Sequence, residues 1–240
     1  MIIGVPKEIK LQEHRIGLTP DSVKVLTKKN HKVLVQSNGG FEAGFTNEDY
    51  KNAGAQIIDN PEEIFKKSEI IVKVKEPQMS EVKMIRENQI IYTYLHLAAA
   101  KELTEGLIKS KSICIAYETV TDNNGRLPLL APMSAVAGRM SIQAGAHSLE
   151  KNQKGRGLLL GGAPGVEPAN VVILGGGVVG ENAAIIATGM KSKVYVIDKS
   201  KDRLKQLHEL FGDKIIAAES DKIDLKKLVS ECDLLIGGVL

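Results

Sequence analysis

The feature that most constrains the fold of this chain is a glycine-rich turn that follows a short apolar segment. Residues 171–174 read Val-Val-Ile-Leu, which is typical of a buried strand, and Gly175 follows directly. Gly175, Gly177 and Gly180 have the spacing of a dinucleotide-binding turn. The first glycine permits a tight turn, the second lets a pyrophosphate approach the backbone, and the third lets helix and strand pack closely. The segment therefore predicts a strand, a phosphate-binding turn and a helix whose N-terminus attracts phosphate.

A second apolar segment supports this interpretation. Residues 194–197 read Val-Tyr-Val-Ile and predict the next strand, which ends in Asp198. An acidic side chain about 20 residues beyond the glycines accepts hydrogen bonds from the ribose hydroxyls of NAD and repels the 2′-phosphate of NADP. The alternative is a glycine turn in another kind of α/β domain, with Asp198 capping the next helix. We predict that NAD, in preference to NADP, is the cofactor.

Apolar strands alternate with helical segments along the whole chain of 240 residues. This alternation predicts an α/β protein with mostly parallel sheets, both faces of which are covered by helices. The composition shifts at residues 122–125 and again at Pro128 and Pro132. We therefore expect two doubly wound parallel-sheet domains, residues 1–128 and residues 129–240, with Ser134 capping a long connecting helix.

The second domain is expected to be of the Rossmann type and incomplete. Its predicted strands lie near residues 171–174, 194–197, 214–218 and 234–236, whereas a doubly wound dinucleotide domain usually has about six strands. The last of these strands is expected to have an open edge, which favours association with other chains.

Composition excludes several classes of function. The 32 Lys and Arg residues are scattered and nearly balanced by 29 Asp and Glu, so nothing indicates a nucleic-acid or membrane-surface partner. The N-terminal residues lack the pattern of a signal peptide, and no apolar run is long enough to span a bilayer. Cys114 and Cys232 lie in separate apolar segments, which predicts reduced core cysteines in a cytoplasmic protein, and no Cys/His cluster has metal-ligand spacing.

Three ionisable residues of the first domain lie where open α/β sheets bind ligands, beyond the carboxyl ends of strands. Arg15 is in the loop after the first strand, Lys75 ends a predicted strand over residues 70–75, and His96 follows one over residues 90–95. An arginine binds a carboxylate with two parallel hydrogen bonds, a lysine offers a point charge, and a histidine moves a proton near neutral pH. Together they fit a dehydrogenase that acts on a small anionic substrate.

Each candidate has a structural alternative. Arg15 and Lys75 can be ordinary surface cations, and His96 can be a capping or core histidine. Lys73 is expected on the same strand face as Lys75 and competes with it. Glu118, just after the predicted strand over residues 113–116, is a weaker candidate for orienting a neighbour.

Segments spread over the whole chain resemble the alanine dehydrogenase/pyridine nucleotide transhydrogenase family. The matching segments are MIIGVPKEIK (1–10), RIGLTP (15–20), VKVKEP (72–77), YLHLAA (94–99), AYETV (116–120), LPLL (127–130), PMSAVAGRM (132–140) and GGGVVG (175–180). The resemblance implies a reversible NAD-dependent reaction of L-alanine and water that yields pyruvate and ammonium. It implies that Arg15 and Lys75 hold the substrate, and that His96 shuttles the proton as water attacks the imine and the carbinolamine collapses.

The resemblance also implies a set of cofactor contacts. Val178 and Val179 join the three glycines at the pyrophosphate, and Asp198 meets the adenosine ribose. Further cofactor positions fall on Ser134, Arg203, Ser220, Val239 and Leu240. The family implies homohexamers of two-domain subunits, with the substrate as a small molecule.

Two alternative functions stay open at this point. One is the soluble NAD-binding subunit of a proton-translocating transhydrogenase, and the other is an inactive, truncated member of the family. Family members continue beyond Leu240 with further strands, a catalytic aspartate and a segment that returns to the first domain. We therefore expect the 240-residue chain on its own to show little or no turnover.

Overall fold

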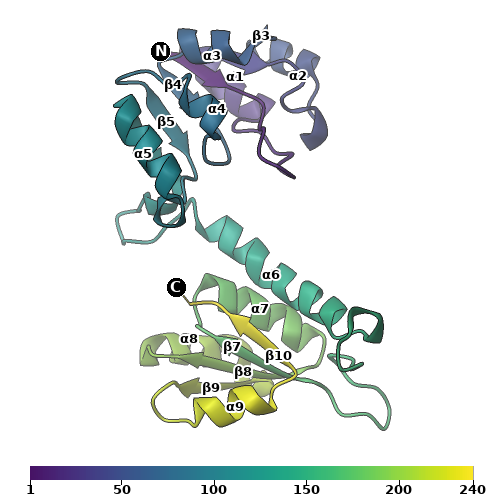
Figure 1. The fold of residues 1–240 in the computed structure, drawn as a ribbon. Helices are drawn as coiled ribbons and strands as arrows, with labels where there is room; N and C mark the ends of the chain where they lie inside the picture. The colour runs from purple at the N-terminus through teal and green to yellow at the C-terminus, as the bar shows by residue number, and fades with distance from the viewer. Residues whose placement is uncertain (240) are drawn as a thin grey trace. The chain divides into compact units, whose positions relative to one another are not determined.

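The computed structural model describes residues 1–239 and forms two compact units, Met1–Leu129 and Leu130–Leu240. Each unit is a parallel sheet flanked by helices (Figure 1), so the predicted α/β fold with two parallel-sheet domains is confirmed. The division between the units lies one residue from the predicted boundary between residues 128 and 129.

The N-terminal unit contains a sheet of parallel strands in the order β3-β2-β1-β4-β5-β6. In register, Ile3 of β1 lies opposite Val33 on one side and Ile70 on the other. The elements of this unit are β1 (Ile2–Val5), α1 (Pro20–Lys28), β2 (Lys32–Gln36), η1 (Phe41–Ala43), α2 (Asn47–Asn52), β3 (Gln56–Ile58), α3 (Pro61–Lys67), β4 (Ile70–Val72), α4 (Met79–Val82), β5 (Ile90–Thr93), η2 (Leu97–Ala99), α5 (Lys101–Ser110), β6 (Ile113–Ala116) and η3 (Tyr117–Thr119).

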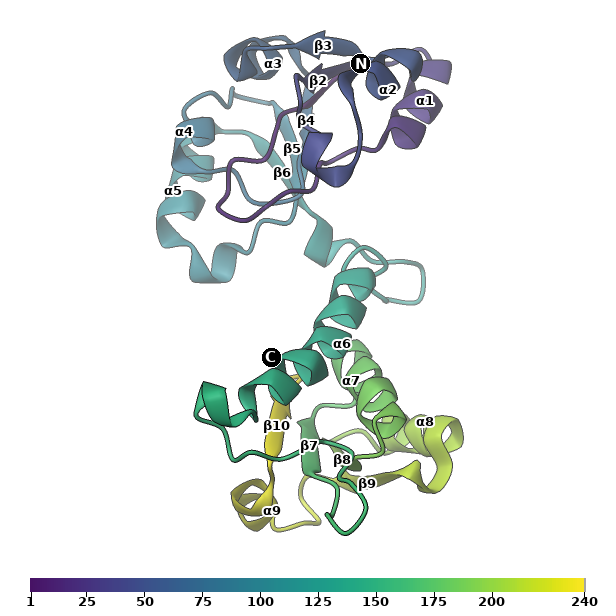
Figure 2. The ribbon, with the colours of Figure 1, turned by 90° about the vertical axis from the view of Figure 1, so that its right-hand side faces the viewer.

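The strand order determines which helices cover each face of this sheet. Crossover connections between parallel strands are right-handed, so a reversal in the direction of strand addition moves the next helix to the opposite face. From β1 to β3 the chain adds strands in one direction, and α1 and α2 cover one face; after β3 it reverses, and α3, α4 and α5 cover the other (Figure 2). The two faces have separate cores, one around Val23 and Tyr50 and the other around Ile64, Phe65 and Leu103.

The expectation that helices cover both faces of the sheet is wrong at β6. Ile113 and Ile115 lie two residues apart on β6, so their side chains point to the same face of the sheet. They are 49% and 41% exposed. Because α4 and α5 both lie on the opposite face, no helix of the N-terminal unit reaches the side of β6 that these isoleucines occupy. Strands β4 and β5 also end sooner than predicted, at Val72 and Thr93, so Lys75 and His96 each lie three residues beyond a strand.

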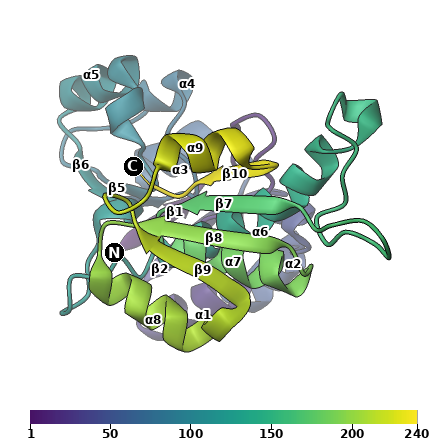
Figure 3. The same ribbon diagram turned by 90° about the horizontal axis from the view of Figure 1, so that it is seen from below.

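The C-terminal unit has four parallel strands in the order β10-β7-β8-β9 within the described residues (Figure 3). Its elements are α6 (Ala131–Ser148), η4 (Lys151–Gln153), β7 (Asn170–Leu174), α7 (Val178–Gly189), β8 (Lys193–Asp198), α8 (Lys201–Phe211), η5 (Gly212–Lys214), β9 (Ile215–Glu219), α9 (Leu225–Glu231) and β10 (Leu234–Gly237). Helices α6, α7 and α8 share one core with the sheet, and α9 lies on the opposite face (Figure 2). The crossover from β9 back to β10 reverses direction, which explains the change of face.

Ser134 does not cap the long helix, contrary to the prediction. Helix α6 begins at Ala131, with Leu130 as its N-cap and Pro132 in the first turn, so Ser134 lies inside the helix. Proline is favoured in the first turn because its missing N–H has no intrahelical acceptor there. The same helix packs closely on α7 because it has a glycine at position 138, where a Cβ would lie 2.2 Å from the Val179 carbonyl oxygen.

Candidate functional site

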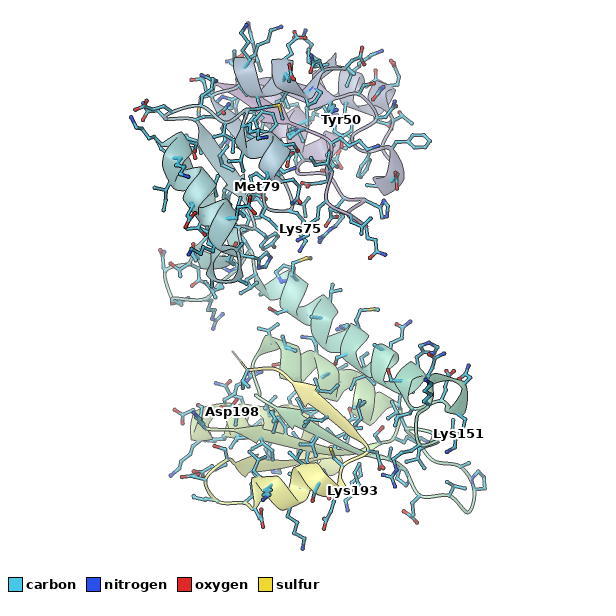
Figure 4. The ribbon with its side chains drawn as sticks, in the orientation of Figure 1. Tyr50, Lys75, Met79, Lys151, Lys193 and Asp198 are labelled. Atoms are coloured by element: carbon cyan, nitrogen blue, oxygen red, sulfur yellow. The ribbon has the colours of Figure 1, made fainter. Side chains whose placement is uncertain are left out.

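The candidate residues of the N-terminal unit lie near the carboxyl ends of its central strands. Arg15 is in the loop after β1, Lys75 follows β4 and His96 follows β5. Strands β1, β4 and β5 are neighbours in a parallel sheet, so all three segments leave the same edge. Figure 4 shows Lys75 at this edge, beyond the tips of β4 and β5. The sheet topology thus brings together residues that are up to 81 positions apart in the sequence.

Arg15 is oriented by a carboxylate that the sequence analysis did not identify. The Arg15 Nε donates to Glu13 Oε1 at 2.8 Å and Nη2 donates to Glu13 Oε2 at 2.6 Å, which is the bidentate arrangement of an arginine–carboxylate pair. The Glu13 side chain is only 7% exposed. The hydrogen bond from Arg15 lowers the pKa of Glu13 to about 2, and the charge of Lys75 acts in the same direction. The charges of both cations thus favour the ionised form of one carboxylate.

Lys75 is held through its backbone by a buried ion network. Glu8 Oε1 accepts hydrogen bonds from the N–H groups of Val74 and Lys75, at 2.6 Å and 3.2 Å. Glu8 Oε2 lies 3.0 Å from Lys73 Nζ, and the same nitrogen lies 2.8 Å from Glu81 Oε1. The Lys73 side chain is fully buried, so it is a structural cation that does not compete with Lys75.

His96 lies in a left-handed turn, with φ of 50° and ψ of 39°. This conformation is unfavourable for a residue with a side chain and needs support from its surroundings. Glu118 supplies it, because Oε1 accepts from the His96 N–H at 2.7 Å and from the Leu95 N–H at 3.0 Å. The weaker prediction that Glu118 orients a neighbour therefore has a structural basis, through the backbone of His96.

Tyr94 extends this group, and sequence reasoning missed it. Its ring stacks on the His96 ring with centroids 6.2 Å apart, and its hydroxyl donates to the Leu129 carbonyl. Burial raises the pKa of Tyr94, while the charge of Arg15 opposes this change. The sequence offered two signals: Tyr94 lies in the family segment 94–99, and it stands two residues before His96. The stacking itself forms in the turn after β5, which ends at Thr93.

The glycine turn of the C-terminal unit has the geometry that its spacing predicts. Gly175 has φ of 96°, and Gly177 is the N-cap of α7. A Cβ on Gly180 would lie 1.8 Å from the Gly175 carbonyl oxygen, so helix and strand pack too closely for any side chain there. A Cβ on Gly177, in contrast, would meet nothing within 4 Å. The fold therefore does not need a glycine at position 177, and the open space beside it suits a bound pyrophosphate.

Asp198 ends β8 beside this turn, and Figure 4 shows it where β8 leads into α8. Its Oδ2 accepts the Gly176 N–H at 2.6 Å and its Oδ1 accepts the Ser200 N–H at 2.8 Å. The side chain of Ser200, not that of Asp198, caps α8. Each carboxylate oxygen has a second lone pair, so both can still accept a ribose hydroxyl.

The other predicted cofactor residues differ in their distance from the turn. Ser220 follows β9 and its N–H donates to the Asp198 carbonyl at 3.1 Å. Val239 follows β10, and its Cγ1 would lie 2.7 Å from a Cβ on Gly175. Ser134 is one helical turn before Gly138, which contacts the start of α7 through Val179. The remaining candidates are Val178 and Val179 in the first turn of α7, Arg203 in the first turn of α8, and Leu240, which lies outside the described residues.

Residues 1–239 contain no group of three or more His, Cys, Asp or Glu side chains that is able to hold a metal ion. None of the helices in this part of the chain combines the length and apolarity needed to cross a membrane.

In the parallel sheet of the C-terminal unit, β7 leads into the glycine turn and β8 ends in an acidic residue, Asp198. These features define a Rossmann-type α/β protein. Family comparison narrows this class. Residues 4–137 match the N-terminal domain of the alanine dehydrogenase/PNT family, and residues 141–240 match its C-terminal domain. The chain therefore belongs to the alanine dehydrogenase/PNT family.

Individual relatives agree with this assignment. The chain is 50% identical over all 240 residues to an alanine dehydrogenase of Methanococcus maripaludis, and covers 64% of that protein. It is 48% identical to an alanine dehydrogenase of Bacillus subtilis, of which it covers 63%. The chain thus spans a little under two thirds of the length of these curated relatives.

Solved structures give the same result. One described as L-alanine dehydrogenase superposes with a TM-score of 0.90 at 50% identity, covering 100% of this chain and 66% of the other. A transhydrogenase from Sinorhizobium meliloti superposes with a TM-score of 0.80 at 19% identity, covering 100% of this chain and 70% of the other. The second likeness shows the fold alone.

Proposed function

We propose that this chain carries the substrate-binding, proton-transfer and NAD-binding groups of an alanine dehydrogenase, which oxidises L-alanine reversibly to pyruvate and ammonium. The observation that supports this most directly is the 50% identity to alanine dehydrogenases over every residue of the chain. The transhydrogenase alternative rests on a likeness of 19% identity and is less well supported. In this proposal residues 1–128 bind the substrate and residues 129–240 bind NAD.

The N-terminal unit supplies the substrate groups. Arg15, oriented by Glu13, and Lys75, held by Glu8, present positive charge that attracts the carboxylate of alanine or pyruvate. His96 is exposed at the same sheet edge, and its imidazole accepts and returns the proton as water adds to the imine carbon and the carbinolamine loses ammonia. Glu118 keeps this histidine in its turn.

The C-terminal unit supplies the cofactor groups. The open space beside Gly177 and the positive end of α7 fit a pyrophosphate, and Asp198 accepts the ribose hydroxyls. NAD, when bound, accepts the hydride. Val178, Val179, Ser134, Arg203, Ser220, Val239 and Leu240 complete the proposed cofactor contacts.

The cellular compartment and the oligomeric state are part of the same proposal. Both cysteines are free in the part of the chain that the structure describes, which is consistent with a cytoplasmic, reducing environment. By resemblance to the family we propose a homohexamer that takes part in L-alanine catabolism. Sedimentation velocity measures the assembly directly, and a purely monomeric protein would contradict this point.

A kinetic comparison tests the proposal. The chain is assayed at 340 nm with L-alanine and NAD, and with pyruvate, ammonium and NADH, while NADH binding is followed separately by fluorescence. Because little or no turnover is expected of the 240 residues alone, the main expected result is that the chain and His96→Asn both bind NADH. Any residual turnover of the chain should fall by about 100-fold or more in His96→Asn, the usual contribution of a general acid–base. His208→Asn, an exposed histidine of α8, is the matched control. Turnover that survives His96→Asn, or NADH binding that requires His96, would contradict the assigned roles.

A further inference from the structure

Arg203 lies beside the glycine turn, and each of its three guanidinium nitrogens has a partner. Nε donates to the Gly176 carbonyl at 2.6 Å, Nη1 donates to Gln206 Oε1 at 3.0 Å, and Nη2 forms an ion pair with Glu181. The two charged side chains come from the first turns of α8 and α7. The arginine and glutamate side chains are 26% and 32% exposed, so solvent screens their interaction only partly.

The position of this pair relative to Asp198 is informative. A Cβ built on Gly176 would lie 3.3 Å from Asp198 Oδ2 and 3.5 Å from Arg203 Cγ, so the acid and the arginine flank the same residue. In Rossmann-type sites an acid at the end of the second strand receives the 2′-hydroxyl of NAD, whereas an arginine nearby receives the 2′-phosphate of NADP. This chain has both residues at one place, and a second carboxylate binds the arginine.

We propose that Glu181 is a second determinant of the preference for NAD over NADP, because its carboxylate prevents Arg203 from acting as a ligand for a 2′-phosphate. The inference rests on the proposed binding of NAD by this unit. A phosphate that reached Arg203 would have to share the guanidinium group with Glu181 or displace it. Sharing places two anions side by side, and displacement exchanges one charge-assisted hydrogen bond for another, so the phosphate gains less than an arginine without this partner would offer. Specificity here comes from making the competing ligand unfavourable.

Asp198 and Glu181 act on the phosphate in different ways, which makes them separable. Asp198 repels a 2′-phosphate directly, whereas Glu181 withholds the cation that would attract it. Substitution of Asp198 alone removes the repulsion but leaves Arg203 engaged. Substitution of Glu181 alone releases Arg203 but leaves the repulsion, so the two substitutions together are expected to have more than the sum of their separate effects.

The experiment is a double-mutant cycle read by equilibrium binding. Dissociation constants for NADH and NADPH are measured by nicotinamide fluorescence, in phosphate-free buffer at one salt concentration, for the wild-type chain, Asp198→Asn, Glu181→Gln and the double variant. We expect Glu181→Gln to improve NADPH binding relative to NADH by about tenfold or more in the Asp198→Asn background, the usual worth of a hydrogen bond between charged groups. The effect of Glu181→Gln in the wild-type background is expected to be smaller. Glu181→Ala, which removes the whole carboxamide or carboxylate group, is a second variant that should release Arg203 in the same way.

Two controls identify the group responsible. Arg203→Ala in the double variant should abolish the gain in NADPH binding. This control is needed because two other cations lie near the end of β8, the exposed Lys199 and Lys201, which pairs with Glu219. Glu209→Gln makes the same change of charge at an exposed position of α8 and should leave the ratio of the two constants within about twofold of wild type.

The outcomes separate this inference from the proposed function. No gain from Glu181→Gln in the Asp198→Asn background, or a gain that survives Arg203→Ala, would overturn the role of Glu181 while leaving NAD binding intact. Failure of the wild-type chain to bind either nucleotide would reject the cofactor part of the proposed function, and the inference with it.

Discussion

Substitution of the buried Lys73 by methionine should destabilise the N-terminal unit strongly. The Lys73 ammonium is the one cation between two carboxylates, and the side chains of Lys73, Glu8 and Glu81 are 0%, 1% and 3% exposed. Methionine has a similar length and no charge, so little of the effect comes from a cavity. What it removes is the cation that compensates two buried negative charges.

The magnitude follows from the burial. Removal of one partner from a buried ion pair costs about 3–5 kcal/mol, because the other charge stays desolvated and uncompensated. We therefore expect Lys73→Met to lower the free energy of unfolding of this unit by about 3–5 kcal/mol at neutral pH. Desolvation already raises the pKa of Glu81 in the wild-type chain, and loss of the lysine raises it further.

The pH dependence has a definite sign. A carboxyl group whose pKa is raised by folding binds a proton in the folded state that the unfolded chain does not bind. Stability of the variant therefore increases as the pH falls from neutrality toward the unfolded value of 4.5. The difference from wild type should shrink by up to about 1.4 kcal/mol per pH unit for each carboxyl group that takes up a proton.

Urea unfolding measures these quantities, followed by the near-ultraviolet circular dichroism of tyrosine. Four of the five tyrosines belong to the N-terminal unit, so the signal reports mainly on it. Lys83→Met, at an exposed lysine of the same unit, is the control and should change stability by less than about 0.5 kcal/mol. Glu81→Gln should restore part of the stability lost in Lys73→Met. A loss below about 1 kcal/mol, or one that grows as the pH falls, would refute the reasoning.

Three further predictions concern the candidate sites. Gly177→Ala should leave the melting temperature nearly unchanged and abolish NADH binding measured by fluorescence. Gly180→Ala should lower the melting temperature, since a Cβ at position 180, unlike one at position 177, meets backbone atoms. Equal melting temperatures of the two variants would contradict this. Glu118→Ala should lower any residual turnover of the chain by about tenfold or more, because the left-handed turn of His96 loses its acceptor. Glu118→Gln, which keeps an acceptor oxygen, should recover most of that rate, and equal losses in both variants would argue against a positioning role. The carboxyl group of Glu13 should titrate near pH 2 by carbon-13 NMR, since its pKa is about 2; a midpoint near 4.5 would show that its arginine pair does not form in solution.

Local signals were sufficient for a large part of this fold. The spacing of Gly175, Gly177 and Gly180 predicts the turn that the structure has. Gly175 supplies a positive φ and Gly180 packs against the Gly175 carbonyl, whereas Gly177 meets no atom of the chain and is explained by the expected ligand. The alternation of apolar strands and helices likewise predicts the parallel sheets, since burial on both faces requires near-continuous apolar strands. Predictions that depended on helix and strand ends were less accurate, as at Ser134, because a proline two residues earlier already starts α6.

The amino-acid sequence by itself determined the fold class, the glycine turn and the residue types that can bind an anion or move a proton, since these depend on local spacing and side-chain chemistry. Only the tertiary structure decided which of those residues act together. Lys73 and Lys75 are equivalent in the sequence pattern, yet one is buried between carboxylates and the other lies at the sheet edge. The pairs Glu118–His96 and Glu181–Arg203 join residues 22 positions apart in each case. Such contacts depend on strand order and crossover handedness, which place distant segments at one sheet edge and leave no trace in local periodicity.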